Sequence, residues 1–250
     1  MGLLTTAAAA AASRRQVNVH DQSYMISDYV GAAPRRGVYV AGNESNDNGL
    51  PQGFLVEQPA GATTQPHFHI HPQFQLVIDG SGALGKHALS PLSLHYVNGH
   101  TPYGPVSAGA DGLRYFTLRR YWDPGAKYMP ASKDKLLKGN QRTRVGDMTA
   151  STTFCLANLN TIVSAEVIAA EDDGLAAWLM QVGPQMKFRA PLAPRGDGQY
   201  HIVVAGNVLL HGQTLECLSC GFIEAYEKQP LYQATNQGAA MMICQFPRPQ

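Results

Sequence analysis

The stretch from Gly61 to Gly80, GATTQPHFHIHPQFQLVIDG, places three histidines on alternate residues of one predicted β-strand. Alternate residues of an extended strand project from the same face, so His67, His69 and His71 are expected to share one surface. Imidazole nitrogens suit transition metals, whereas magnesium and calcium prefer oxygen ligands. The pattern therefore predicts a site for one transition-metal ion (Fe, Mn, Ni, Cu or Zn).

The spacing of this stretch resembles the first signature of the cupin superfamily, in which Gly, His-x-His, Glu and a second Gly follow one another at fixed intervals. Its five positions are filled here by Gly61, His67, His69, Gln73 and Gly80. Gln73 stands where a metal-binding cupin usually has Glu, and its neutral carbonyl oxygen replaces an anionic ligand. His71 lies outside the signature and is an optional ligand.

A second cupin-like signature follows in the stretch GKHALSPLSLHYVNGHTPYGP. Gly85 and Pro91 keep its first spacing, but the position of the closing histidine is taken by Tyr103. The third metal ligand is therefore left open among His95, His100 and Tyr103. We expect His67, His69, Gln73 and His100 to bind the metal, with Tyr103, Gln73 and His95 as the candidate catalytic groups.

An internal repeat links the two halves of the chain. A shift of 126 residues lays Gln73–Gly80 over Gln199–Gly206, and the apolar alternation continues to Val97 and Ile223. This predicts two related β units. The second copy has no His-x-His and is expected to be structural. Because Gln199 has no histidines nearby, its match to Gln73 favours a structural hydrogen bond shared by both glutamines.

The fold class is predicted to be all-β. Short β-rich runs bounded by turn residues are typical of a sandwich or barrel, and they cover 37–41, 54–57, 113–119, 178–182 and 241–246. The cupin resemblance implies two jelly-roll β-barrels in one chain. The predicted domains are a flexible N-terminal segment (1–22), a barrel carrying the His-x-His site (23–122), an exposed linker (123–150) and a degenerate barrel (151–250).

The composition excludes some classes of binding partner. The chain has 250 residues, of which 44% are hydrophobic, and its formal net charge is +1. This balance gives no attraction for a polyanion, so no nucleic acid is expected. No apolar run approaches the roughly 20 residues that span a bilayer, so no membrane partner is expected either. Four cysteines do not suggest a disulfide framework, which favours the cytoplasm.

The cupin resemblance implies a metal-dependent enzyme that acts on a small polar or aromatic molecule. Oxygen-dependent cleavage, as in a dioxygenase, is the first expectation. A non-redox lyase or isomerase is the second, and a metal-free protein that binds a small ligand is the third. The resemblance is also compatible with a homodimer.

Overall fold

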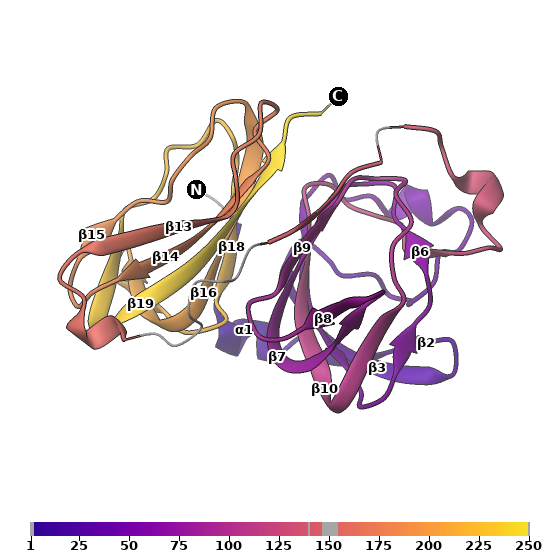
Figure 1. Ribbon diagram of the computed structural model, residues 1–250, viewed down its shortest axis with the longest axis horizontal. Coiled ribbons are helices and arrows are strands. Elements are labelled where there is room, and N and C mark those ends of the chain that lie inside the picture. Colours follow the sequence, from indigo (N-terminus) through magenta and orange to yellow (C-terminus); the bar gives the residue numbers. More distant parts are fainter. Residues whose placement is uncertain (1–2, 140, 147–154, 250) are drawn as a thin grey trace. The chain divides into compact units, whose positions relative to one another are not determined.

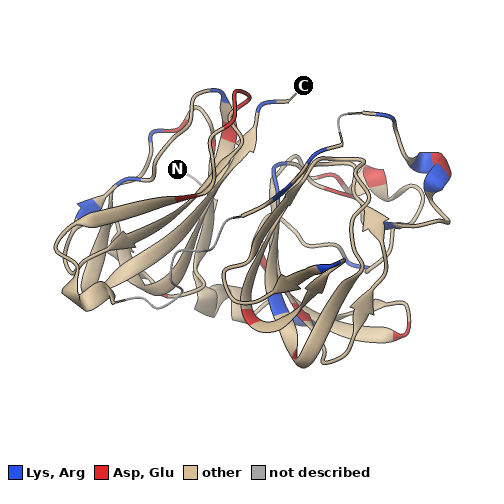
Figure 2. Cartoon of the chain, viewed as in Figure 1, with Lys and Arg blue, Asp and Glu red and all other residues tan. Residues whose placement is uncertain are grey.

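The computed structural model describes residues 3–139, 141–146 and 155–249. The chain forms two compact units, Ala12–Val145 and Met1–Ala11 with Gly146–Gln250 (Figure 1). Each unit is built on one large antiparallel sheet, and α1 (Ala7–Ala11) is the single α-helix within the described ranges. The all-β fold class is therefore confirmed. Basic and acidic residues are interspersed in both units (Figure 2).

The first unit carries a nine-stranded sheet that surrounds an apolar core. Inward-facing side chains such as Val56, Val77, Val97 and Tyr115 fill this core. The main path of the sheet is β12 (Thr143–Val145), β9 (Leu94–Val97), β7 (Gln73–Leu84), β10 (Val106–Arg119), β4 (Gln52–Gln58), β3 (Gln22–Val30) and β2 (Arg15–Val19). Off this path, β5 (Thr63–Thr64) pairs with β10 and β8 (His87–Leu89) with β7, while β6 (His67–Phe68) and β11 (Lys127–Tyr128) form a separate pair.

The second unit has an eight-stranded sheet with its own core, which includes Trp178, Phe188, Val203 and Met241. The path is β1 (Leu3–Thr5), β18 (Cys220–Ile223), β16 (Gly196–Leu210), β19 (Tyr232–Pro247), β14 (Ala176–Val182) and β13 (Ile162–Ile168). Two short strands lie off the path, where β15 (Lys187–Phe188) pairs with β19 and β17 (Gln213–Leu215) with β16.

The predicted repeat is present in the strands. β8, β9 and β10 begin 126 residues before β17, β18 and β19. The backbone repeats as well, because Leu92 and Leu218 have φ of 71° and 72°. Gly80 and Gly206 also have positive φ, and a Cβ on either would lie 2.2 Å from a carbonyl oxygen of the adjacent strand. Glycine is required at both places.

Four of the five β-rich runs lie inside strands, namely β4, β10, β14 and β19. The fifth, 37–41, is wrong, because it forms no strand. Its backbone is held by the chain after β10 instead, where the Tyr39 N–H donates to the Ala126 carbonyl at 2.9 Å. Periodicity alone does not separate such a short apolar run from a strand.

Two segments differ from the expected domain plan. Instead of a flexible start, Leu3–Thr5 pairs with β18 of the second unit, and Arg15–Val19 is a strand of the first. The expected linker contributes β11 and β12 to the first unit, because Lys127–Tyr128 pairs with β6 and Thr143–Val145 with β9. Residues 140 and 147–150 of that linker lie outside the described ranges. No helix in the described part of the chain is long and apolar enough to cross a membrane.

Candidate functional site

The histidine stretch is shorter as a strand than its alternation predicts. β6 ends at Phe68, and the chain bends at Ile70 and His71. The bend removes His71 from the face shared by His67 and His69, and its ring lies 5.4 Å from that of Tyr121. His67 and His69 stay together, with ring centroids 5.3 Å apart. The three-histidine face is therefore reduced to two members.

His67 lies between two tyrosines on neighbouring chain segments. It pairs with Tyr103 on one side and with Tyr128 of β11 on the other, at ring distances of 4.5 and 5.3 Å. Its Nδ1 donates to the Gln65 carbonyl oxygen at 2.8 Å, so in the neutral ring the lone pair is on Nε2. Burial, followed by the positive charge of His69, lowers the pKa of His67 to about 3. The ring is neutral at pH 7.

His69 is held at both ring nitrogens. Its Nδ1–H donates to Asp123 Oδ1 at 2.7 Å, and its Nε2 accepts from Arg119 Nη2 at 3.0 Å. Burial, with the charge of Arg119 next, lowers the pKa of His69 to about 4. Burial opposes ionisation of Asp123, yet electrostatic attraction to His69 and then to Arg119, with the hydrogen bond from His69 next, holds its pKa well below the usual range. A guanidinium, a neutral imidazole and a carboxylate therefore form one buried chain.

Arg119 is the centre of this cluster. It ends β10 and is 2% exposed. Its Nε donates to Gln73 Oε1 at 3.1 Å, its Nη1 donates to Gln52 Oε1, and its guanidinium carbon lies 5.6 Å from the ring centroid of Phe54. The cation thus contacts two of the three donors that the first signature offers to a metal, His69 and Gln73.

Gln73 has the structural role predicted from the repeat. It lies directly opposite Arg119 across β7 and β10, as Gln199 lies opposite Gln245 across β16 and β19. Gln199 Nε2 donates to Gln245 Oε1 at 2.8 Å, so both glutamines make a cross-strand hydrogen bond, Gln73 as the acceptor and Gln199 as the donor. Gln73 Nε2 also donates to the hydroxyl of Tyr103, whose pKa is raised by burial. Gln73 connects Tyr103 to Arg119.

The two other candidates for a third ligand lie on different sides of this cluster. His95 on β9 is 6% exposed, its ring lies 5.6 Å from that of Tyr103, and burial lowers its pKa to about 4. His100 lies against Phe68, with ring centroids 5.7 Å apart, and its Nδ1 accepts from the Leu137 N–H at 3.3 Å. Phe68 points away from the face of His67 and His69 because successive strand residues alternate. His100, which was expected to be a fourth ligand, therefore lies on the side of Phe68 and is not brought together with His67 and His69.

This donor set does not fit a metal ion. A metal would need the lone pair of His69 Nε2 and an oxygen lone pair of Gln73, and both atoms accept N–H groups of Arg119. One imidazole lone pair does not serve a guanidinium and a cation together, and the fixed charge of Arg119 repels a metal. Within the described ranges, no group of three His, Cys, Asp or Glu residues is arranged to hold a metal.

Three residues of the cluster escaped the sequence analysis, namely Gln52, Arg119 and Asp123. Arg119 had a usable signal, because it aligns with Gln245 at the repeat offset. Asp123 begins a turn, and Ile70 and Gly125 donate backbone N–H groups to it at 3.0 and 2.9 Å. Its sequence context, Asp-Pro-Gly, reads only as a loop.

A cavity of about 90 Å³ adjoins Arg119 and His69. Its polar atoms include the hydroxyls of Tyr24 and Thr64, which hydrogen-bond at 2.9 Å. The remaining wall is mostly apolar and includes Val17, Ile26, Phe54, Val56, Ala126 and the rings of Tyr115 and Tyr128. A small cavity with a buried cation at one end suits a molecule with an oxygen group on a compact apolar body.

Comparison with known proteins supports the fold. No protein-family model and no curated protein matches the chain. Among solved structures, a protein from Nostoc punctiforme described as a putative dioxygenase has a TM-score of 0.62 and 11% identity, over 99% of this chain and 79% of that one. Pirin YhhW from Escherichia coli, in complex with nickel(II), has a TM-score of 0.54 and 11% identity, over the whole of both chains.

A third similar structure is oxalate decarboxylase from Bacillus subtilis, a protein with Mn(II) centres. Its TM-score is 0.52 at 10% identity, over 99% of this chain and 78% of that one. These neighbours are cupins, so the chain has the bicupin fold of two jelly-roll barrels that the internal repeat and the cupin-like signature of its first copy implied. At this identity the likeness shows the fold, and the chemistry has to be argued from the site.

Proposed function

We propose that this bicupin is a metal-independent, non-redox enzyme of the lyase or isomerase class, whose first barrel binds a small molecule through a carbonyl or carboxylate oxygen. The observation that carries the proposal is the chain Asp123–His69–Arg119. A guanidinium supplies the positive charge beside the two signature histidines, where a metal would otherwise supply it. Arginine suits this role because its charge is permanent and its donors are fixed in a plane.

Arg119, Asp123 and His69 each have a separate role in the proposed reaction. Arg119 receives the substrate oxygen and stabilises negative charge that develops on it. Asp123 holds the Nδ1–H tautomer of His69, which leaves Nε2 as the proton acceptor. When the Arg119 N–H that binds His69 Nε2 donates to the substrate oxygen instead, the lone pair of Nε2 becomes free to accept a proton. Proton abstraction next to a carbonyl therefore begins only once a substrate oxygen occupies the guanidinium.

The cavity limits the substrate to a compact molecule. About 90 Å³ is less than the roughly 150 Å³ of an engineered cavity known to bind benzene. The apolar wall favours a short hydrocarbon or methyl group next to the oxygen function. Small α-keto or α-hydroxy carboxylates combine these features.

A metal-dependent dioxygenase is the second candidate. Two observations favour it. No hydrogen bond to His67 Nε2 is found within the described residues, and similar folds hold manganese or nickel. This candidate requires Arg119 to leave both His69 and Gln73. It predicts that added Mn(II) or Ni(II) binds and raises the melting temperature.

The test uses pyruvate as the probe, in D₂O, followed by NMR. Saturation transfer reports binding, and loss of the methyl proton signal reports proton abstraction. We expect Arg119→Gln to abolish binding, and His69→Gln to retain binding but abolish exchange. His100→Gln, outside the cluster, is the control and should leave both unchanged. Exchange that survives His69→Gln, or that requires added metal, contradicts the proposal.

A further inference from the structure

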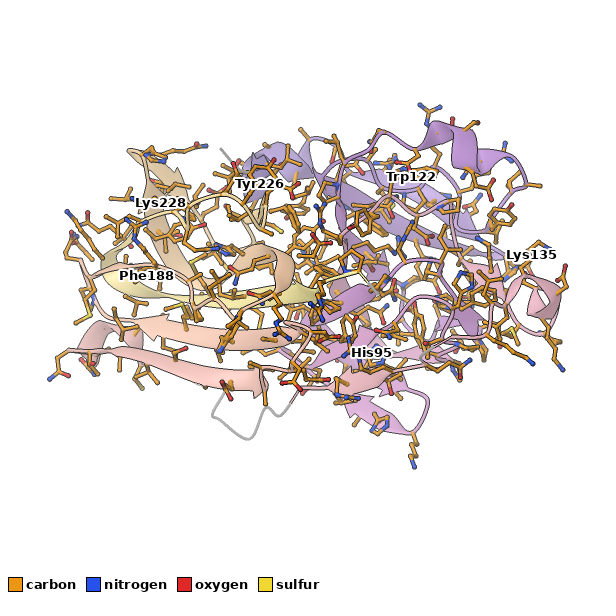
Figure 3. All side chains as sticks on the ribbon, turned by 90° about the horizontal axis from the view of Figure 1, so that it is seen from above. His95, Trp122, Lys135, Phe188, Tyr226 and Lys228 are labelled. Carbon is orange, nitrogen blue, oxygen red and sulfur yellow. The ribbon has the colours of Figure 1, made fainter. Side chains whose placement is uncertain are left out.

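The first unit has a second, larger cleft that shares no lining residue with the cavity beside Arg119. It measures about 280 Å³ and is open to the surface. Its wall is formed by the turn between β7 and β8, by the segment before β10, by His95 of β9 and by β12. We propose that this cleft is a binding site for a small organic carboxylate, with His95 (Figure 3) as the hydrogen-bond donor at its base.

His95 has a feature that packing alone does not explain. It is 6% exposed, and its buried Nδ1 has no hydrogen-bond partner. An unpaired buried N–H is rarer and more costly than an unpaired acceptor, so the proton of the neutral ring belongs on Nε2. The ring is neutral at pH 7 because burial lowers the pKa of His95 to about 4. His95, which lines the cleft, thus offers one N–H donor at Nε2.

The charge of the cleft selects the ligand. Lys86 and His87 are exposed on the turn at its rim, and no acidic residue lines it. A carboxylate would gain attraction from Lys86 at the rim and a hydrogen bond from His95 at the base. Leu84, Pro102 and Val145 supply an apolar wall for the body of the same ligand.

The second unit has a cleft of about 550 Å³ at the repeat positions, lined by Leu210, His211, Lys228, Gln229 and Pro230, so the cleft is shared by both units and the histidine distinguishes the first. Gly221 occupies the position of His95 in the repeat. It pairs with β16 in the same register in which His95 pairs with β7. Strand β1 covers β18 there, and Leu4 packs so closely that a Cβ on Gly221 would lie 2.9 Å from its Cδ1. In the first unit, β12 takes the place of β1, and the histidine side chain faces the cleft.

The experiment is a calorimetric titration of the full chain with benzoate, with benzyl alcohol as the uncharged control. Benzoate should bind saturably and benzyl alcohol at least about tenfold more weakly, a factor equal to about 1.4 kcal/mol. His95→Leu should weaken benzoate at least tenfold, while His95→Gln, which keeps a donor, should recover part of the loss. Lys86→Gln should weaken it severalfold and reduce its dependence on salt.

Arg119→Gln separates this proposal from the proposed function. Benzoate binding should be unchanged in that variant, whereas pyruvate binding is lost. Ring ¹⁵N shifts of His95 should report a proton on Nε2 and should move on addition of benzoate. Benzoate affinity equal in wild type and His95→Leu, or a proton on Nδ1, would overturn the proposal whatever happens at Arg119.

Discussion

Arg119 is a buried cation that is linked to the carboxylate of Asp123 through the ring of His69. Its N–H groups bind His69 and Gln73, and Asp123 balances its charge from the other side of the imidazole. Removing one member of a buried charge pair leaves the other uncompensated, at a cost of about 3–5 kcal/mol. The same residue therefore determines both the stability of the first unit and the charge of its cavity.

Arg119→Met tests this account through stability. We expect the free energy of unfolding of the first unit to fall by about 3–5 kcal/mol, because Asp123 remains buried without its cation. The chain has two tryptophans, Trp122 in the first unit and Trp178 in the second. Urea unfolding of Trp178→Phe protein, followed by Trp122 fluorescence, measures the first unit. A loss below about 1 kcal/mol would show that the cluster does not depend on Arg119.

Buried neutral histidines make the first unit sensitive to acid. The pKa values of His67, His69 and His95 lie at about 3, 4 and 4, below the ordinary value near 6.5. Between about pH 6.5 and pH 4 the unfolded chain binds protons that the folded chain does not, so stability falls as pH falls. The slope is about 1.4 kcal/mol per pH unit for each histidine.

Urea unfolding of the Trp178→Phe protein at pH 7, 6 and 5 measures this loss. His95→Leu is the matched variant, because it should reduce the slope by one proton while the other two histidines still contribute. Equal unfolding free energies at pH 7 and pH 5 would contradict the assignment of neutral rings.

At the scale of elements, a glycine lies at each end of the histidine stretch, and the two glycines have different structural roles. Gly61 and Gly80 both have positive φ, of 69° and 79°. A Cβ on Gly61 would meet nothing within 4 Å, whereas one on Gly80 would lie 2.2 Å from the Gly112 carbonyl oxygen. The first glycine serves only the turn, and the second also permits the close approach of β7 and β10.

Alanine substitutions should distinguish these two structural roles. Gly61→Ala should cost about 1–2 kcal/mol for the left-handed backbone alone. Gly80→Ala should cost clearly more, because the clash is with backbone and the strands must separate. Paired unfolding measurements on the two variants, again through Trp122, provide the comparison. Equal losses would mean that the sheet adapts at Gly80 without strain.

The sequence predicts local features of the site well and distant contacts poorly. His67, His69 and Gln73 fall within a few residues of one another, and their spacing located the site. Arg119 and Asp123 lie 50 and 54 residues from His69 along the chain, so no local spacing connects them to the histidines. The contacts of the Arg119 guanidinium with His69 and Gln73 are visible only when the strands have been brought together. His71 was misplaced for a local reason, because the bend at Ile70 interrupts the alternation.

At the scale of the whole molecule, the chain repeats one β unit and keeps the polar cluster in the first copy. Gln245 takes the place of Arg119, and its amide is bonded to Gln199, Gly174 and Ala193. His201 is neutral and bonded to Tyr232 and Gln199. The second unit thus satisfies the same positions with uncharged groups, as expected for a structural copy.

Gln245→Leu tests the division between the two units. Loss of its bonds should destabilise the second unit by about 2–3 kcal/mol, since buried polar partners are left unsatisfied. Trp178 fluorescence in Trp122→Phe protein reports that loss. Pyruvate and benzoate binding by the otherwise unchanged chain should stay the same. Lost binding in a folded variant would mean that the second unit contributes to the sites.

The most direct test of the central claim is the metal content of untagged protein after saturation with Mn(II) or Ni(II) and removal of free metal. If the guanidinium of Arg119 takes the place of a metal, wild type should hold less than about 0.1 ion per chain and its melting temperature should not rise. One tightly bound ion per chain, lost in both His67→Ala and His69→Ala, would contradict the account.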